Sequence, residues 1–259
     1  MTRASSVSAR AASRSTPRPR RATTGYFRDS ETPLTSLVFL LPLIVLYEVG
    51  TRQFVSDPSH ATEQRIVAFS LMQRFFELCG ATGRYLPAFV VITILMSCHL
   101  ARRDPWRVKM GYLGAMWVES LALALPLILI GIVASRYLSH LPLAATTSVR
   151  TALLVLSLGA GVYEELVFRL MAFAVLSFIL LDVFELPRGT GYLLIVLISS
   201  VMFSAYHYLG DEPFSVRTFA FRTVAGVYFG GVYLGRGFGI TAAAHTLYDV
   251  LIVLWRWPM

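Results

Sequence analysis

The chain has 259 residues, of which 56% are hydrophobic and only 15% are charged, and its mean hydropathy is +0.62. This composition excludes an ordinary soluble domain, because such domains carry about 25% charged residues. The formal charge of +8 does not indicate a nucleic-acid partner, because many of the arginines gather in the N-terminal segment and are not spread over a folded face.

Residues 1–32 form the first predicted element. They combine Ser, Thr, Ala and Pro with seven arginines, and no acidic residue precedes Asp29. Such a segment cannot bury enough apolar surface to fold, so we predict a disordered, basic, cytoplasmic tail. An Arg-rich, acid-poor start is also typical of an organelle transit peptide, which remains an alternative.

The rest of the chain, residues 33–259, is dominated by long apolar segments. A helix needs roughly 20 apolar residues to cross the hydrocarbon of a bilayer. We therefore predict an all-α, polytopic transmembrane helix bundle with about seven spans, in the range six to eight. The predicted spans lie near residues 33–50, 85–101, 110–134, 149–182, 191–209, 217–235 and 239–256. Together they make one membrane domain, with a motif-bearing core at 149–256.

Two connections in the first half carry further information. The segment Glu63–Leu78 mixes apolar and charged residues, as expected of a helix that lies at the membrane interface. Four basic residues crowd the short connection that follows the second span: Arg102, Arg103, Arg107 and Lys109. By the positive-inside rule, this loop and the N-terminus are cytoplasmic. We expect an integral protein of a bacterial cytoplasmic membrane. The two cysteines show no metal-ligand spacing.

The fourth predicted span contains ionisable residues where lipid makes them costly. Glu164 and Glu165 are adjacent, and Arg169 follows. On a helix, Glu165 and Arg169 lie one turn apart on the same face, where they can form an ion pair. Glu164 is then left to face a cavity. The alternative is a buried ion pair that only fixes helix packing.

Two further polar motifs lie in the later spans. Phe203 and His207 stand four residues apart near the end of the fifth span, and His245 and Asp249 stand four residues apart in the seventh. Each histidine alone is compatible with a buried hydrogen bond. A carboxylate beside a histidine determines which ring nitrogen carries the proton.

The three motifs together favour one shared site, because each ionisable group inside a span needs a partner or a purpose. A carboxylate and an imidazole can activate a water molecule as a nucleophile, while a second imidazole stabilises the oxyanion that develops. Ser204 lies within a turn of His207, but nothing else indicates an acyl-enzyme.

In these motifs the chain resembles the CPBP family of intramembrane peptidases, which includes CAAX prenyl proteases and bacteriocin-processing enzymes and is also called Abi. Members carry EExxxR, FxxxH and HxxxN or HxxxD on successive membrane helices. Here the motifs run from Glu164 to Arg169, from Phe203 to His207 and from His245 to Asp249. The trio lies in the expected order within the last 110 or so residues, whereas the chain before Thr151 matches only as membrane sequence.

The resemblance implies a role for each motif. Glu164 is the implied base with His207 as its partner, while His245 and Asp249 form the oxyanion side. Glu165, Arg169 and Phe203 are supporting residues. Many members have Asn at the last motif position, and an ionised Asp cannot donate as an amide does. Asp249 is therefore assigned to orienting His245.

No cofactor is expected. Glu164, His207 and His245 could ligate zinc in principle, but no HExxH motif is present and the metal-free mechanism is favoured. The implied partners are the lipid bilayer and a membrane-embedded or lipidated peptide substrate. Nothing in the chain decides between prenylated tails and bacteriocin precursors, and nothing predicts an oligomeric state.

Two other functions compete with the peptidase. An ion- or proton-coupled transporter also uses intramembrane acids and histidines, but the first half offers only Glu119 deep in a span. The other is an idle scaffold or immunity protein of the same fold. Straight spans would also place His207 and His245 near opposite membrane faces. Their convergence therefore requires either a different number of spans or a broken, re-entrant or strongly tilted helix, which the glycines from Gly230 to Gly239 permit.

Overall fold

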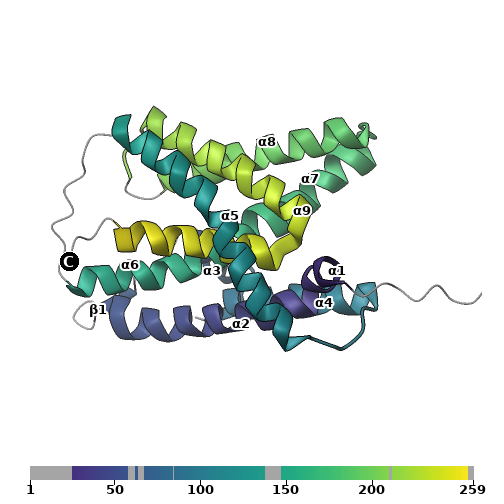
Figure 1. The fold of residues 1–259 in the computed structure, drawn as a ribbon, viewed down its shortest axis with the longest axis horizontal. Coiled ribbons are helices and arrows are strands. Elements are labelled where there is room, and N and C mark those ends of the chain that lie inside the picture. Colours follow the sequence, from purple (N-terminus) through teal and green to yellow (C-terminus); the bar gives the residue numbers. More distant parts are fainter. Residues whose placement is uncertain are drawn as a thin grey trace, which may run out of the picture.

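A computed structural model describes residues 25–57, 62–63, 67–83, 85–137, 147–209 and 212–255. These residues form a bundle of helices, with one short antiparallel pair of strands, β1 (Ser56–Asp57) and β2 (Thr62–Glu63) (Figure 1). The predicted all-α membrane bundle is confirmed. Residues 1–24 of the expected tail lie outside the described residues. Its last part is helical, because α1 spans Tyr26–Ser30.

The helices follow one another in the order of the predicted spans. They are α2 (Pro33–Gly50), α3 (Val67–Leu78), α4 (Leu86–Arg102), α5 (Met110–Tyr137), α6 (Thr147–Gly159), α7 (Ala172–Ser177), α8 (Arg188–Tyr206) and α9 (Val216–Trp255). Wider, π-type turns occur at η1 (Thr51–Val55), η2 (Ala160–Glu164), η3 (Leu166–Met171) and η4 (Phe178–Val183), and α8 ends in a short turn, η5 (His207–Leu209).

Five stretches of the described chain are long and apolar enough to cross a membrane. They are Pro33–Val55, Met110–Ile132, Val149–Val183, Arg188–Leu209 and Val216–Trp255, and Leu86–Arg102 is a shorter apolar helix. The last stretch covers both predicted spans, 217–235 and 239–256, as two helical arms that share the label α9. With α9 counted as two arms and α4 included, the helices correspond to the seven predicted segments.

The two arms of α9 meet at Gly237, where the backbone leaves the helical conformation with φ 73° and ψ −177°. Residues other than glycine rarely adopt this combination, because a Cβ would clash with the backbone. The chain reverses here, so the arm 238–255 runs back beside the arm 216–236 (Figure 1). This break removes the difficulty that straight spans would keep His207 and His245 apart.

Gly237→Ala is expected to destabilise the fold by roughly 1–3 kcal/mol, because alanine would be strained at this φ and ψ. Gly235→Ala is the matched control, since a Cβ at Gly235 would meet no atom within 4 Å and its φ is not positive. Thermal unfolding in detergent should give a lower Tm for the first variant only. Equal Tm values for the two variants would show that the backbone conformation at position 237 does not require glycine.

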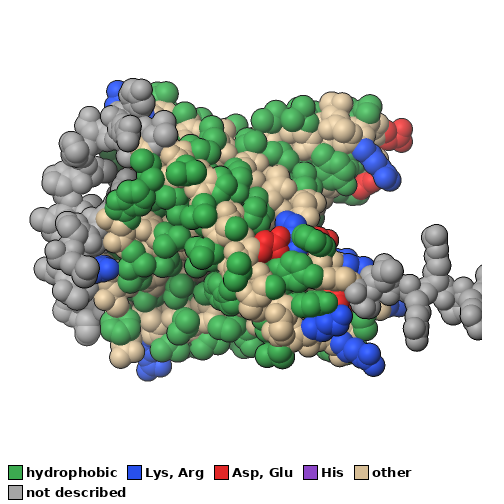
Figure 2. Space-filling model, viewed as in Figure 1, with side chains coloured by type: hydrophobic (Ala, Val, Ile, Leu, Met, Phe, Trp, Pro, Cys, Tyr) green, Lys and Arg blue, Asp and Glu red, His purple; other side chains and the backbone are tan. Residues whose placement is uncertain are grey.

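A cluster of charges anchors the residue before the break. Arg236 donates to the Glu119 carboxylate of α5, with one of the bonds at 3.0 Å. It also donates to Glu31 at 2.6 Å and to the Ser30 hydroxyl at 2.8 Å. Acidic and basic side chains are visible together near the break of α9 in Figure 2. Glu119, the acid that lies deep in a predicted span of the first half, therefore has a structural partner.

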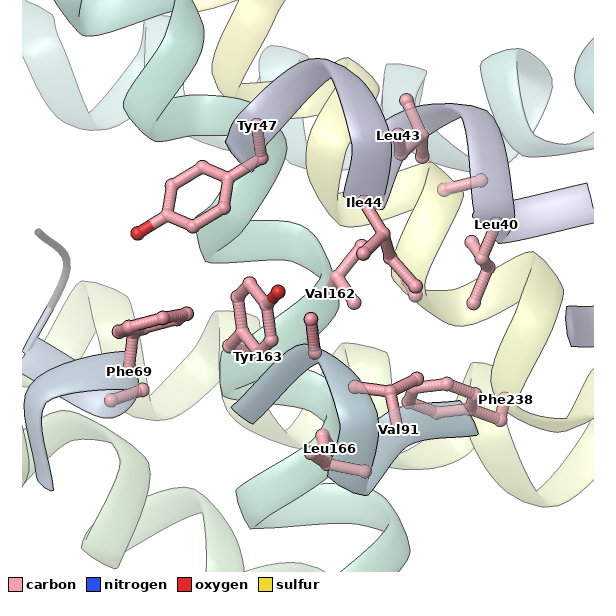
Figure 3. Packing of buried hydrophobic residues seen from close by; sticks show 14 of the residues in the cluster. Leu40, Leu43, Ile44, Tyr47, Phe69, Val91, Val162, Tyr163, Leu166 and Phe238 are labelled. Atoms are coloured by element: carbon pink, nitrogen blue, oxygen red, sulfur yellow. The ribbon is translucent and has the colours of Figure 1, made fainter. Parts of the chain in front are cut away.

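The apolar core fixes the backbone beside the motif that contains Glu164. The ring of Tyr163 packs against Tyr47 of α2 and Phe69 of α3, with centroid distances of 5.3 and 5.0 Å (Figure 3). On another side, a Cβ added at Gly161 would lie 2.6 Å from the Ala242 carbonyl oxygen. The glycine therefore lets η2 lie directly against the second arm of α9.

The predicted interfacial segment Glu63–Leu78 is described from Val67 onward as α3. One face of α3 is buried, with Phe69 fully covered, whereas Phe75 and Leu78 are exposed. This amphipathic arrangement agrees with the predicted pattern, and the position of α3 at a membrane interface stays a prediction.

Candidate active site

Glu164 and Glu165 lie where two π-type turns, η2 and η3, meet inside the long helical stretch Val149–Val183. Such turns widen the helix and occur often at functional sites. Both carboxylates are buried, as is the Arg169 side chain. The sequence motif therefore places three ionisable groups in the interior of the bundle, where unpaired charges are costly.

The predicted pair between Glu165 and Arg169 is present. The Arg169 Nε lies 3.1 Å from Glu165 Oε2, and both side chains are fully buried. Arg169 also donates from Nη2 to the Gly226 carbonyl oxygen of α9 at 3.1 Å. Its guanidinium lies 4.8 Å from the ring centroid of Phe203 on α8. Arg169 therefore links the first motif to the helices that carry the other two.

His245 of the second α9 arm lies among three carboxylates. Its Nδ1 is 2.7 Å from Glu165 Oε1, while its Nε2 is 3.7 Å from Glu164 Oε2 and 3.5 Å from Asp249 Oδ2. The ring also stacks on Phe229 of the first arm, at 4.6 Å and 21°. The carboxylate that accepts a hydrogen bond from His245 and orients its ring is therefore that of Glu165. The sequence had assigned this role to Asp249.

Glu164 has a different partner from the one implied by the motifs. The Tyr206 hydroxyl, at the end of α8, donates to Glu164 Oε1. His207 instead places its Nδ1 2.8 Å from the carbonyl oxygen of Phe203 in its own helix. Within the described part of the chain, no hydrogen bond joins His207 to Glu164. The end of α8 therefore does provide a partner for Glu164, but this partner is Tyr206 and not the next residue, His207.

His207 nevertheless lies beside the cluster. Its ring centroid is 4.2 Å from that of Tyr206 and 5.1 Å from that of Phe203. Phe203 in turn lies 5.9 Å from His245, so its ring contacts both histidines. The structure therefore gathers all three motifs in one region, with His207 against the rings of Phe203 and Tyr206, and with the two glutamates and His245 in direct proximity.

Two residues of the cluster escaped the sequence motifs, Tyr206 and Phe229. Tyr206 follows Phe203 by three residues, and residues three or four apart share a helix face. Tyr206 therefore shares a helix face with Phe203, as His207 does. This spacing could have indicated Tyr206 as a site residue from the sequence. Phe229 carries no such signal, because its contact with His245 depends on how the two arms of α9 fold together.

The residues named as possible zinc ligands are Glu164, His207 and His245. Within the described ranges, no group of three or more His, Cys, Asp or Glu side chains is arranged to hold a metal ion. We derive no catalytic step through a metal.

One known family matches the part of the chain that carries the three motifs. Residues 146–251 match the family described as Type II CAAX prenyl endopeptidase Rce1-like. The matched region begins just before the stretch that bears Glu164 and ends just after Asp249, so it contains all three motifs. No curated protein and no solved structure matches the chain significantly. The family match, the ordered motifs and the apolar helices identify residues 146–251 as an Rce1-like region of an integral membrane protein, consistent with a membrane protease of the CPBP family.

Proposed function

We propose that the chain is an intramembrane endopeptidase that cleaves membrane-associated peptides or proteins with a water molecule activated by Glu164. The family match supports a membrane endopeptidase of the CAAX-protease type. The observation that carries the mechanism is the buried set of Glu164, Glu165 and His245, with the His245 Nε2 3.7 Å from Glu164 Oε2. A membrane protein that buries such groups together has a functional reason to keep them.

In the proposed reaction, Glu164 removes a proton from water as the water oxygen attacks the scissile carbonyl carbon. The carbonyl oxygen becomes an oxyanion, which accepts a hydrogen bond from His245 Nε2. In this step His245 acts in its doubly protonated form, with Nδ1 donating to Glu165. Collapse of the tetrahedral intermediate breaks the C–N bond, and the proton held by Glu164 passes to the leaving amine.

The remaining residues support these two groups. Arg169 balances the charge of Glu165 at 3.1 Å, which keeps that carboxylate available to hold His245. Asp249 provides a further carboxylate, 3.5 Å from His245 Nε2. It is partly exposed, so we place it on the side of the site from which water or substrate enters. His207 packs against the Tyr206 ring, where we assign it an indirect role.

The proposed enzyme acts on a membrane-embedded or lipidated substrate and uses no metal. We expect purified protein in liposomes to keep its full cleavage rate in the presence of EDTA or 1,10-phenanthroline. A cleavage rate that falls with the chelator and returns only with Zn²⁺ would overturn the metal-free mechanism.

The substrate can be found by comparing the new peptide termini in membranes that contain the wild-type chain or Glu164→Gln. Termini that appear only with the wild type support the proposed function and reveal whether the cleaved proteins are lipidated. Identical sets of termini, combined with a proton flux through liposomes that contain the chain, would favour a transporter instead.

A further inference from the structure

We propose that Tyr206 is a positioning residue, whose hydroxyl holds one oxygen of Glu164 so that the other oxygen accepts the proton from water. The inference deepens the proposed function and rests on it for its catalytic consequence. Its structural part, a hydrogen bond between Tyr206 and Glu164, can be tested without any substrate.

The Tyr206 hydroxyl is committed to Glu164. Tyr206 ends α8, and its side chain is almost fully buried. Its hydroxyl donates to Glu164 Oε1, and among the described residues this is its sole hydrogen bond. A buried phenol that lost this partner would leave both an unpaired hydroxyl and a carboxylate oxygen without its donor.

The ring of Tyr206 is held on several sides, which fixes the direction of the hydroxyl. Its centroid lies 4.8 Å from that of Phe168, 4.2 Å from that of His207 and 6.0 Å from that of Phe203. Phe168 belongs to the same helical stretch as Glu164, so the ring packs on the element whose carboxylate it binds. A packed aromatic ring with two side-chain torsions is a rigid donor, and rigid support of this kind keeps a catalytic group in place.

The two oxygens of Glu164 therefore differ. Oε1 accepts the bond from Tyr206, whereas Oε2 lies 3.7 Å from His245 Nε2, which is longer than a hydrogen bond. Oε2 is the oxygen with capacity left for a water molecule, and it faces the imidazole that would hold the oxyanion. His207 packs against the same ring, with its centroid 4.2 Å from that of Tyr206.

Tyr206→Phe separates this role from simple packing, because it removes the hydroxyl and keeps the ring. Tyr208→Phe is the matched control. The Tyr208 hydroxyl also makes two partly buried bonds, to the Ser215 carbonyl oxygen at 3.0 Å and to the Thr218 hydroxyl at 2.8 Å. Ser215 immediately precedes α9 and Thr218 lies in its first turn, so neither bond involves Glu164. Both variants lose one hydroxyl of the same chemistry from neighbouring positions.

We expect Tyr206→Phe to lower kcat by about 100-fold, as displacement of a catalytic group does, and to leave KM close to the wild-type value. The Tm should fall slightly, because Glu164 Oε1 loses its donor. Tyr208→Phe should keep the wild-type kcat. An unchanged kcat in Tyr206→Phe would overturn the inference, as would a loss confined to KM, which would indicate substrate contact.

Infrared spectroscopy provides a readout that does not need activity. The carboxyl band that disappears in Glu164→Gln should shift in Tyr206→Phe and stay in place in Tyr208→Phe. A band that stays in place in Tyr206→Phe refutes the proposed hydrogen bond, whatever the activity. If the band shifts in Tyr206→Phe but the wild-type protein cleaves no peptide, the hydrogen bond is upheld and the proposed function is refuted.

Discussion

Glu164→Gln is expected to lower kcat for peptide cleavage by roughly 10²- to 10⁴-fold, the usual contribution of a general base. Glutamine has the shape of glutamate, and its amide oxygen can still accept the bond from Tyr206. It cannot take a proton from water. Because the substitution removes the base without creating a cavity, the amount of inserted protein and its Tm should stay near the wild-type values.

Glu77→Gln on α3 is the control for this variant. Glu77 is exposed, and within the described ranges its carboxylate accepts a single bond, from Gln73 one turn away, at 3.2 Å. Cleavage assays on both variants in the same liposomes should show loss for Glu164→Gln alone. A Glu164→Gln protein that cleaves at the wild-type rate would remove Glu164 from the mechanism.

The second large effect concerns stability. Glu165→Leu is expected to destabilise the protein by about 3–5 kcal/mol, because it leaves Arg169 as an uncompensated charge in the interior. Both side chains of this pair are fully buried. Thermal unfolding in detergent should therefore show a marked fall in Tm.

The double variant Glu165→Leu/Arg169→Met distinguishes the structural from the catalytic task of the pair. Replacing both ions with apolar residues should recover most of the lost stability. Activity should stay low, because His245 would have lost the carboxylate that holds its Nδ1 at 2.7 Å. Recovery of both stability and activity would mean that Glu165 only balances the charge of Arg169.

The exposed pair of Glu212 and Arg222 provides the comparison for these stability values. Its two N–O distances are 2.8 Å, but both side chains reach solvent. Removing such a pair typically costs at most about 1 kcal/mol. A Glu212→Leu variant with as large a fall in Tm as Glu165→Leu would contradict the importance given to burial.

The spans and the three motifs could be predicted from the sequence because both depend on short-range patterns. Apolar segments of sufficient length mark helices, and ionisable residues inside them mark a site. The convergence of the motifs was also predicted, because ionisable groups inside spans need partners. A break in a helix between His207 and His245 was one of the arrangements that could bring the motifs together. The glycine at position 237 supplies that break.

The partners within the site could not be predicted in the same way. Whether Glu164 meets Tyr206 or His207 depends on the rotation of α8 about its axis, and adjacent residues differ by about 100° in direction. Similarly, the i, i+4 spacing favours Asp249 as the partner of His245, yet Glu165 from another helix approaches more closely. Such choices arise from the packing of helices, which short-range spacing does not determine.

The same reasoning applies to the charges near the break. Arg236 and Glu119 are separated by more than 100 residues, and neither stands in a recognisable motif. Their pairing depends on the approach of α5 to the break in α9. It also involves Ser30 and Glu31, at the end of a segment that composition alone assigns to a disordered tail.

The central claim is that residues on separate spans form one catalytic unit, and a double-variant comparison tests it most directly. The kcat/KM of Glu164→Gln, His245→Asn and the combined variant should be measured by mass spectrometry of the released peptides. Groups that act as a unit give non-additive losses. We predict that the kcat/KM of the combined variant is about equal to that of the less active single variant. A combined loss equal to the product of the two single losses, or a wild-type rate in either single variant, would contradict the account.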